Sequence, residues 1–308
     1  LPINLPLTAA LHAVAVAGRD AGPPLVAWQH DVATTAERYA DSLHPGQPWD
    51  LLRERWPGVS YVAISEARRE EVATSIGIPA EAVTVIPNGI DVDDVLGIRP
   101  STRAILRDLD LGPSARIFLS PVRIMPRKHL ELGVSLIARL RATGMDARLV
   151  VTGPVDPHEV GVGGYVDRLR ALAHDEGVED AIHLLALESG RRQTSRVALS
   201  DLYRVADALL ITSHDEGFGL PILEAGAARL PVISTDIPSI REIAGPDALY
   251  LDPAGDPAEL ARQVTAHLAE DPVARLAARV RATYAWPMIR DERIEPFLRA
   301  VAARGNSA

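Results

Sequence analysis

Apolar runs of strand length alternate with segments of helical periodicity along residues 115–285 of this 308-residue chain. The strand-like runs are 116–122, 148–152, 182–186, 208–212, 232–235 and 249–251. The helical patterns between and after them are 130–143, 165–176, 202–206, 221–228, 240–243 and 257–268. This alternation is typical of a parallel sheet, because each crossover helix returns the chain to the edge at which the previous strand began. We therefore predict a complete doubly wound domain at 115–285.

The first part of the chain contains fewer strand-like runs. Strand-like runs are found there only at 24–28, 61–64 and 83–86, which is about half of a doubly wound domain. We therefore expect residues 1–91 to form a partial Rossmann-like domain. The sequence begins with Leu1 inside an apolar segment, so either the native start was processed away or the chain is a fragment. The small number of strands in this part favours a fragment.

Two further segments complete the predicted organisation. Residues 92–114 follow the pair Asn88-Gly89, a strong turn-forming combination because both residues tolerate a positive φ. They show no clear core pattern, so we expect an interdomain linker. Residues 286–308 have helical periodicity, and we expect a C-terminal helix that could pack on either domain, including back on the first.

Composition narrows the classes of protein that the chain can represent. Hydrophobic residues make up 47% and charged residues 24% of the chain, as in an ordinary globular protein. No apolar stretch approaches the roughly 18 residues of a membrane span, although peripheral membrane contact stays open. The net charge is −9, without a long basic run, which disfavours nucleic acid as the main partner. The absence of cysteine excludes disulfides and thiolate sites and favours a cytoplasmic location.

The segment DEGFGLPILE, residues 215–224, follows the run 208–212. Its two glycines let the backbone approach a ligand closely, and its proline suits the first turn of a helix. Its N–H groups are therefore expected to form an anion site at a helix N-terminus. Glu216 and Glu224 flank this site, and a carboxylate can accept two hydrogen bonds from the diol of a sugar or a ribose. The alternative is a plain strand-to-helix turn with two solvated glutamates.

Two cations, Arg123 and Lys128, follow the run 116–122. Ligands of doubly wound sheets bind at the carboxyl ends of the strands, so this loop is expected to meet the loop that follows 208–212. Two cations opposite an anion site would suit a diphosphate leaving group, whose charge grows in the transition state. A solvated basic loop is the alternative.

A histidine follows the first strand-like run of the chain. His30 stands in the sequence Trp28-Gln29-His30-Asp31. A histidine at a strand end can donate a hydrogen bond to a hydroxyl or transfer a proton. A lone histidine is more often structural, so both interpretations stay open at this point.

Taken in order, these motifs resemble glycosyltransferase family four, the retaining nucleotide-sugar enzymes with the GT-B fold of two facing Rossmann-like domains. Glu216 and Glu224 match the family's E-x7-E pattern, and Arg123 and Lys128 match its phosphate-binding pair. Further agreements in the family's order are Ser65-Glu66, Pro87-Asn88-Gly89-Ile90-Asp91 and Val151-Thr152-Gly153-Pro154. The resemblance covers the chain from about Leu25 to its end.

The resemblance implies a role for each of these residues. Arg123 and Lys128 would hold the donor diphosphate, and Glu224 would bind the ribose. Glu216 and the backbone that follows it would hold the transferred sugar, which His30 would reach across the cleft. The remaining donor-binding positions are Gly217, Phe218, Gly219, Leu220 and Gly153.

The resemblance also implies which ligands to expect. The donor would be a nucleoside-diphosphate sugar, and the acceptor would carry a hydroxyl group. The two cations would replace a divalent metal, so we expect neither a metal nor a cofactor. The letters Asp108-Leu109-Asp110 form a D-x-D pattern that we interpret as a helix end. The sequence does not specify the donor sugar, its base, the acceptor or the oligomeric state.

The chain departs from the family at its beginning. The family's first domain opens with further strands and a glycine-rich loop, which have no counterpart here. We therefore expect an incomplete first domain joined to a complete second one. Two other functions stay open: a nucleotide-sugar epimerase of the same fold, which needs no acceptor, and a non-catalytic relative that binds nucleotide sugars. Residues 216–224 follow the transferase pattern, which disfavours the epimerase. The intact set of motifs argues against a non-catalytic relative, although the missing first strands keep that alternative open.

Overall fold

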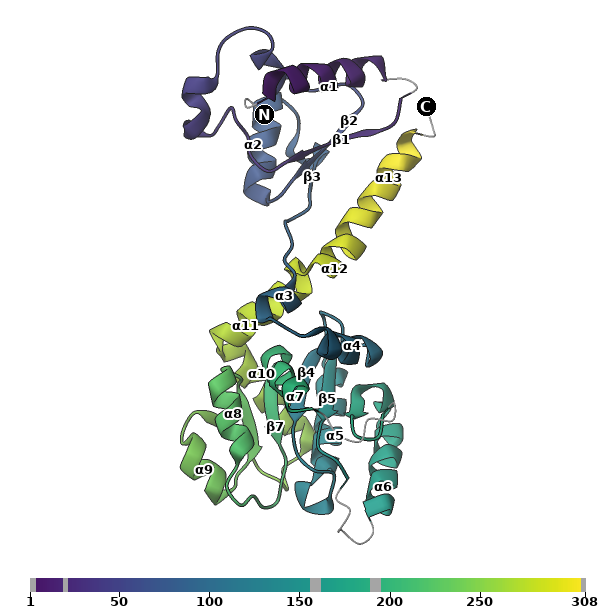
Figure 1. Cartoon of the computed structure of the whole chain (residues 1–308), viewed down its shortest axis with the longest axis vertical. Helices are drawn as coiled ribbons and strands as arrows, with labels where there is room; N and C mark the ends of the chain where they lie inside the picture. The colour runs from purple at the N-terminus through teal and green to yellow at the C-terminus, as the bar shows by residue number, and fades with distance from the viewer. Residues whose placement is uncertain (1–3, 19–21, 156–161, 189–194, 306–308) are drawn as a thin grey trace. The chain divides into compact units, whose positions relative to one another are not determined.

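The computed structural model describes residues 4–18, 22–155, 162–188 and 195–305, and it divides into two compact units (Figure 1). Unit 1 consists of Leu1–Ile90 and Thr283–Ala308, and unit 2 of Asp91–Ala282. Each unit contains a parallel sheet combined with helices. The predicted α/β class with two Rossmann-like domains is thereby confirmed. Among the described residues, no helix has the length and apolar character that a membrane crossing requires.

The described part of unit 1 contains a three-stranded sheet of order β1-β2-β3. Its elements are α1 (Leu5–Ala17), β1 (Leu25–Gln29), β2 (Val59–Ala63), α2 (Glu66–Ile76), β3 (Val83–Val85), α12 (Trp286–Ile289) and α13 (Glu295–Gly305). Ser65 caps α2 by accepting a hydrogen bond of 3.2 Å from the Arg68 N–H, and Gly77 ends it at φ +67°. The capping serine and the glycine thus set both ends of this helix.

The C-terminal segment is part of unit 1. Ile289 is buried and packs with Val62 and Ile86 in a small core. The backbone also joins the two segments, since the Ile90 N–H donates to the Tyr284 carbonyl at 2.8 Å and Ile90 forms a parallel bridge with Ala285. The return of the chain is therefore fixed by backbone pairing as well as by apolar contact.

Gly89 lies where this returning segment crosses the chain. A Cβ at this position would lie 2.6 Å from Cδ2 of Trp286, so no larger residue fits without displacing the indole. A turn was predicted here because asparagine and glycine tolerate a positive φ. In the structure neither Asn88 nor Gly89 has a positive φ. The glycine is required here for close approach and not for backbone conformation.

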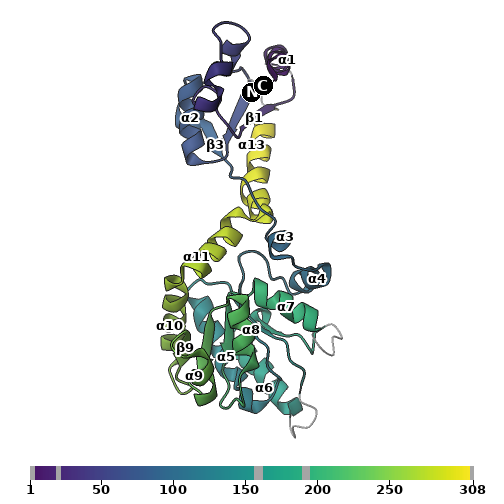
Figure 2. The ribbon, with the colours of Figure 1, turned by 60° about the vertical axis from the view of Figure 1, so that its left-hand side comes forward.

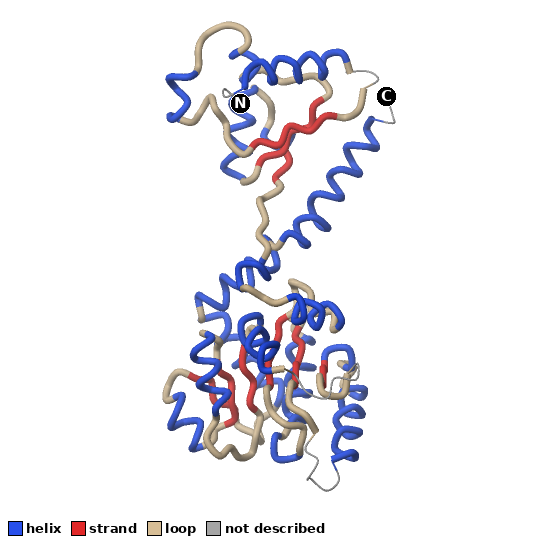
Figure 3. The backbone as a smooth tube through the Cα atoms, in the orientation of Figure 1, coloured by secondary structure: helices blue, strands red, loops and turns tan. Residues whose placement is uncertain are grey.

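The sheet of unit 2 has six strands in the order β6-β5-β4-β7-β8-β9. The strands are β4 (Arg116–Ser120), β5 (Ala147–Val151), β6 (Ile182–Leu184), β7 (Ala208–Ile211), β8 (Val232–Thr235) and β9 (Ala248–Leu251). The helices are α3 (Val92–Leu96), α4 (Pro100–Asp108), α5 (Leu130–Ala142), α6 (Val162–Asp175), α7 (Arg196–Val205), α8 (Leu220–Ala228), α9 (Pro238–Ala244), α10 (Pro257–Glu270) and α11 (Pro272–Arg279). Helix α5 packs with α6 and α10, whereas α8 packs with α7 and α9, and Figure 3 shows these helices around the strands.

The strands of both units lie within two residues of the predicted runs at each end. Helix α7 differs more, because it begins at Arg196 and not at residue 202. Ser195 caps it by accepting a hydrogen bond of 3.1 Å from the Ala198 N–H. The first turn of α7 is therefore specified by a cap, which a search for apolar periodicity does not detect.

Residues 92–114, expected to be a linker, belong to unit 2 in the structure. They form α3 and α4, and Ile105 and Leu106 join the main core. Helix α4 lies beside α7 (Figure 2), where the fully buried Asp201 accepts hydrogen bonds from the Arg99 N–H at 3.1 Å and from Thr102 Oγ1 at 2.8 Å. These partners are about a hundred positions apart in the sequence, so a local pattern does not reveal them.

Candidate functional site

The loops that follow β4 and β7 meet at the carboxyl edge of the unit 2 sheet. The two strands are neighbours and pair in parallel. Lys128 ends a short 3-10 helix after β4, and Glu216 lies in the loop after β7. The Lys128 Nζ lies 2.6 Å from the Glu216 Oε1. The structure therefore brings together two of the residues that the sequence analysis selected.

This ion pair is largely shielded from solvent. The side chains of Lys128 and Glu216 are 8% and 14% exposed. Glu216 Oε1 also accepts a hydrogen bond of 2.6 Å from Ser213 Oγ. A shielded pair of this kind holds both charges in place, and removing either partner leaves the other without compensation. The pairing adds to the expectation from sequence, which gave Lys128 only a diphosphate partner.

Further hydrogen bonds connect the two loops. Thr212 Oγ1 donates to the Lys128 carbonyl at 2.9 Å, and the His214 N–H donates to the Arg127 carbonyl at 2.9 Å. Ser239, at the start of α9, donates to the Glu216 carbonyl at 2.8 Å. Because these bonds fix the backbone on both sides of the ion pair, the pair has a rigid support.

Helix α8 begins directly after Glu216 and its glycine-rich loop. Gly219 precedes the helix at φ +100°, a conformation that favours glycine. The described residues provide no side-chain cap for this helix and no hydrogen-bond acceptor for the N–H groups of 217–219. A Cβ at Gly217 would meet nothing within 4 Å, so the space above the loop is open. This is the geometry of an anion site at a helix N-terminus.

Apolar side chains surround this helix start. Phe218, Leu220 and Leu223 are exposed by 58%, 61% and 48%. Exposed apolar groups next to polar ones are typical of a small-molecule site, where they contact the uncharged parts of a ligand. The backbone of 217–220 and these side chains thus offer both polar and apolar contacts.

Glu224 lies on α8 with an exposed side chain. Its Oε2 accepts a hydrogen bond of 2.7 Å from the hydroxyl of Tyr203 on α7. Tyr203 is only 4% exposed, and burial together with the nearby carboxylate raises its pKa. Sequence reasoning missed this tyrosine. A tyrosine on the apolar face of a helix needs a partner for its hydroxyl, and this requirement was the available indication.

Arg123 is exposed in the loop after β4, and Gly153 in the loop after β5 supports that loop. The Ile124 N–H donates to the Pro154 carbonyl at 3.0 Å. A Cβ at Gly153 would lie 2.1 Å from the Val122 carbonyl oxygen and 2.7 Å from the Arg123 nitrogen. Gly153 therefore acts on the site by allowing the Arg123 loop to pack against its backbone.

Replacing Gly153 with alanine is expected to displace the Arg123 loop and to lower stability by about 1–3 kcal/mol, the usual effect of overpacking. Nucleotide binding is expected to weaken as well, because Arg123 moves with the loop. Gly112→Ala is the matched control, since a Cβ at Gly112 meets nothing within 4 Å. Urea unfolding and calorimetric titration measure both effects. Equal behaviour of the two variants would show that the packing of Gly153 is unimportant.

Two histidines that the sequence analysis did not select lie on the same loops. His129 and His214 are stacked, with ring centroids 4.2 Å apart and an interplanar angle of 18°. His129 has φ +45°, and its buried Nδ1 has no hydrogen-bond partner among the described residues. Burial and the neighbouring His214 lower the pKa of His129. The neutral form of His129 is therefore favoured in the folded protein.

Acidification is expected to destabilise unit 2 through this histidine. The unfolded chain binds the proton more readily, because the pKa of His129 is lowered by folding. Stability therefore falls as the pH drops through the ordinary histidine range, near about 6.5. His129→Asn, which tolerates the positive φ, is expected to reduce the loss of melting temperature between pH 7.5 and 5.5. His174→Asn, at an exposed position, is the control. An unchanged pH dependence in His129→Asn would exclude the effect.

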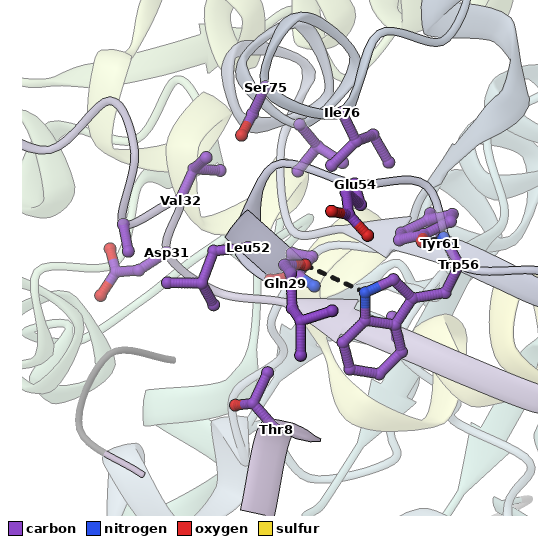
Figure 4. Close-up of a pocket in the computed structure, with 14 residues that line it drawn as sticks. Thr8, Gln29, Asp31, Val32, Leu52, Glu54, Trp56, Tyr61, Ser75 and Ile76 are labelled. Carbon is purple, nitrogen blue, oxygen red and sulfur yellow. Dashed lines mark hydrogen bonds between the residues drawn. The ribbon is translucent and has the colours of Figure 1, made fainter. Parts of the chain in front are cut away.

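His30 lies in unit 1, directly after β1, and its side chain is exposed. The neighbouring residues Gln29 and Asp31 line a cavity of about 110 Å³ beside β1 and α2 (Figure 4). At this cavity the Trp56 Nε1–H donates to the Leu51 carbonyl at 3.0 Å. The two units are described separately, so the structure assigns His30 no place relative to the unit 2 site.

Comparison with known proteins agrees with these motifs. Residues 102–283 match the family described as Glycosyl transferases group 1, and residues 3–94 match Glycosyltransferase Family 4. A D-inositol 3-phosphate glycosyltransferase of Xylanimonas cellulosilytica is 31% identical over 227 residues, which cover 72% of this chain and 51% of that protein. A GDP-mannose-dependent alpha-(1-6)-phosphatidylinositol monomannoside mannosyltransferase of Mycobacterium tuberculosis is 31% identical over 187 residues, covering 60% of this chain and 46% of that protein.

Among solved structures, HepE of Anabaena in complex with UDP and glucose is 23% identical, with a TM-score of 0.46, and the match covers 94% of this chain and 75% of that chain. The chain spans about half the length of the curated relatives it matches. The match at 102–283 takes in more than half of the 308 residues. The resemblance to glycosyltransferase family four is thereby confirmed, and the chain belongs to the group 1 glycosyl transferases.

Proposed function

We propose that the chain is the catalytic part of an enzyme that moves a hexose from a nucleoside-diphosphate sugar to a hydroxyl acceptor, with retention of anomeric configuration. The observation that carries the proposal is the shielded Lys128–Glu216 pair beside the open N-terminus of α8. Cationic and N–H donors suit a diphosphate, and a fixed carboxylate suits sugar hydroxyls. The relatives named above are transferases, and one of them is GDP-mannose-dependent, which favours transfer over epimerisation.

The donor diphosphate is assigned to Arg123 and Lys128. When the bond between the sugar and the diphosphate breaks, negative charge develops on the departing phosphate oxygen. A cation held in a shielded position stabilises this charge without rearranging, and it acts more strongly there than in water. Lys128 is held in this way by Glu216. Arg123 is exposed, and its planar group can bind a phosphate through two hydrogen bonds.

The transferred sugar is assigned to Glu216 and to the N–H groups of 217–219, and the donor ribose to Glu224. Glu216 Oε1 is engaged by Lys128 and Ser213, so Oε2 is the oxygen assigned to a sugar hydroxyl. We also propose that His30 of unit 1 contacts the same sugar, as the family resemblance implies. His30→Ala is then expected to slow transfer without changing the affinity for free nucleoside diphosphate.

Two further parts of the proposal concern the metal requirement and the cellular location. We propose that transfer needs no divalent metal, because the two cations supply the positive charge. Transfer is then expected to continue in EDTA, whereas complete loss that added metal restores would contradict this part. A cytoplasmic location remains a prediction from the composition.

A thermal-shift screen with UDP, GDP, ADP and their sugar conjugates tests the donor class. A ligand that binds the folded state raises the melting temperature, by an amount that increases with its affinity. The best donor is then incubated with and without hydroxyl acceptors, and the products are analysed by NMR. A new glycoside with retained configuration supports the proposal. Conversion of the donor without an acceptor would indicate an epimerase, and binding without any product a non-catalytic protein.

A further inference from the structure

The hydrogen bond between Tyr203 and Glu224 joins a buried group to an exposed one. The ring of Tyr203 belongs to the main core of unit 2, and α7 packs directly on α8. Glu224, by contrast, is exposed and lies on the outer face of α8. The bond of 2.7 Å from the Tyr203 hydroxyl to Glu224 Oε2 therefore restricts a carboxylate that solvent alone would leave free to rotate.

Such a restriction matters for binding. Ordering a glutamate side chain costs conformational entropy, because a long charged side chain loses much of its rotamer freedom. A carboxylate that is held before the ligand arrives has already lost this freedom, so the complex is stronger by part of that cost. A tyrosine hydroxyl is protonated at neutral pH, and burial with the nearby carboxylate raises the pKa of Tyr203 further, so it can act as the donor.

The bond also divides the two carboxylate oxygens between different partners. Oε2 accepts from Tyr203, whereas no hydrogen bond from the described residues engages Oε1. We propose that Tyr203 is a positioning residue for the donor: it holds Glu224 so that Oε1 accepts a hydrogen bond from a ribose hydroxyl. This inference rests on the proposed function, in which Glu224 binds the ribose. It adds that ribose recognition depends on a residue of α7 that touches no part of the ligand.

The test compares ribose with deoxyribose ligands. The affinities of UDP, GDP and ADP are measured by calorimetric titration, and the tightest is compared with its 2′-deoxy and 3′-deoxy forms. The wild type is expected to bind the ribose form at least about 10-fold more tightly than one deoxy form, as loss of a hydrogen bond to a charged group implies. Tyr203→Phe is expected to weaken the ribose form by about 5- to 10-fold and to leave that deoxy form nearly unchanged.

Three further variants sharpen the comparison. Glu224→Gln is expected to lose the same discrimination, and adding Tyr203→Phe to it should have little further effect, because the two residues act as one unit. Tyr250→Phe is the matched control. Tyr250 belongs to the same unit, and its hydroxyl donates to the Gly245 carbonyl at 2.7 Å, so this variant loses a comparable bond away from Glu224. It is expected to keep the wild-type affinities.

The outcomes separate the inference from the function on which it rests. Full discrimination in Tyr203→Phe, together with its loss in Glu224→Gln, would overturn the positioning role and leave the ribose role intact. Equal affinities for ribose and deoxyribose ligands in the wild type, or no binding of any of the three nucleotides, would remove the ribose role itself. Equal weakening of both forms with a lowered melting temperature would show a merely structural tyrosine.

One more variant, Glu224→Asp, covers the case in which Tyr203→Phe does not fold. Glu224→Asp shortens the side chain by one methylene group, so the carboxylate cannot reach Tyr203 and the ribose together. Loss of discrimination in Glu224→Asp supports the inference. Wild-type discrimination in this variant would overturn it, because an unpositioned carboxylate would then suffice.

Discussion

Replacing Lys128 with alanine is expected to slow sugar transfer by about 10²- to 10³-fold, because it removes a shielded cation from the developing charge of the diphosphate. The change is also expected to destabilise unit 2 by roughly 3 kcal/mol, since Glu216, with a side chain only 14% exposed, loses its ionic partner. The Ser213 hydroxyl still donates to Glu216, which keeps this loss at the lower end of the usual range. Release of nucleoside diphosphate and urea unfolding measure the two effects.

Two variants separate the two consequences of losing Lys128. Arg123→Ala removes an exposed cation, so transfer is expected to fall while the unfolding free energy falls less than in Lys128→Ala, whose cation is shielded. In Lys128→Ala/Glu216→Gln the unpaired Glu216 charge is absent. The unfolding free energy should therefore return towards the wild-type value, whereas the transfer rate should stay low. Wild-type transfer rates in both single alanine variants would refute the diphosphate assignment.

Replacing Glu216 with glutamine is expected to have opposite effects on turnover and on the binding of free nucleotide. Turnover should fall by about 10²-fold or more, because the neutral amide holds sugar hydroxyls less strongly than a carboxylate in the transition state. Free nucleoside diphosphate should bind more tightly, because a negative charge near the anion site disappears and Lys128 no longer has an ionic partner there. Steady-state kinetics and calorimetric titration measure the two quantities.

Glu224→Ala provides the contrast to this variant. Glu224 lies on α8 and bonds to Tyr203 instead of Lys128, so its loss is expected to weaken nucleotide binding. Weaker binding in Glu216→Gln and unchanged binding in Glu224→Ala would mean that the two glutamates have the reverse roles.

The sequence was sufficient to locate the strands, because apolar runs buried on both faces of a parallel sheet have a distinctive pattern. It also placed Lys128 and Glu216 on loops expected to meet, since the carboxyl ends of neighbouring parallel strands share an edge. The direct pairing of these two side chains was not predictable in the same way. It depends on rotamers and on hydrogen bonds from Ser213 and Thr212, which the spacing of a motif does not contain.

Other features escaped prediction because their partners are distant in sequence. Tyr203 and Glu224 are 21 positions apart and lie on different helices. Asp201, which fixes α4, is 99 positions from Thr102. Gly89 was assigned to a turn, whereas its small size serves the approach of Trp286. In each case the contacted group lies elsewhere in the chain, so a local sequence pattern does not reveal the contact.

The two-segment composition of unit 1 has a consequence for the order of events during synthesis. Asp91–Ala282 is continuous, so every residue of unit 2 has been translated before Thr283–Ala308 of unit 1 is made. The core formed by Val62 and Ile86 stays open until Ile289 emerges, although these two residues are translated about two hundred codons earlier. Nascent chains of increasing length should therefore gain protease resistance in unit 2 first. Unit 1 acquires the contacts of Ile289 only after all of unit 2 has been translated, and until then the face of β2 that carries Val62 lacks this cover and is the segment that a chaperone would have to protect.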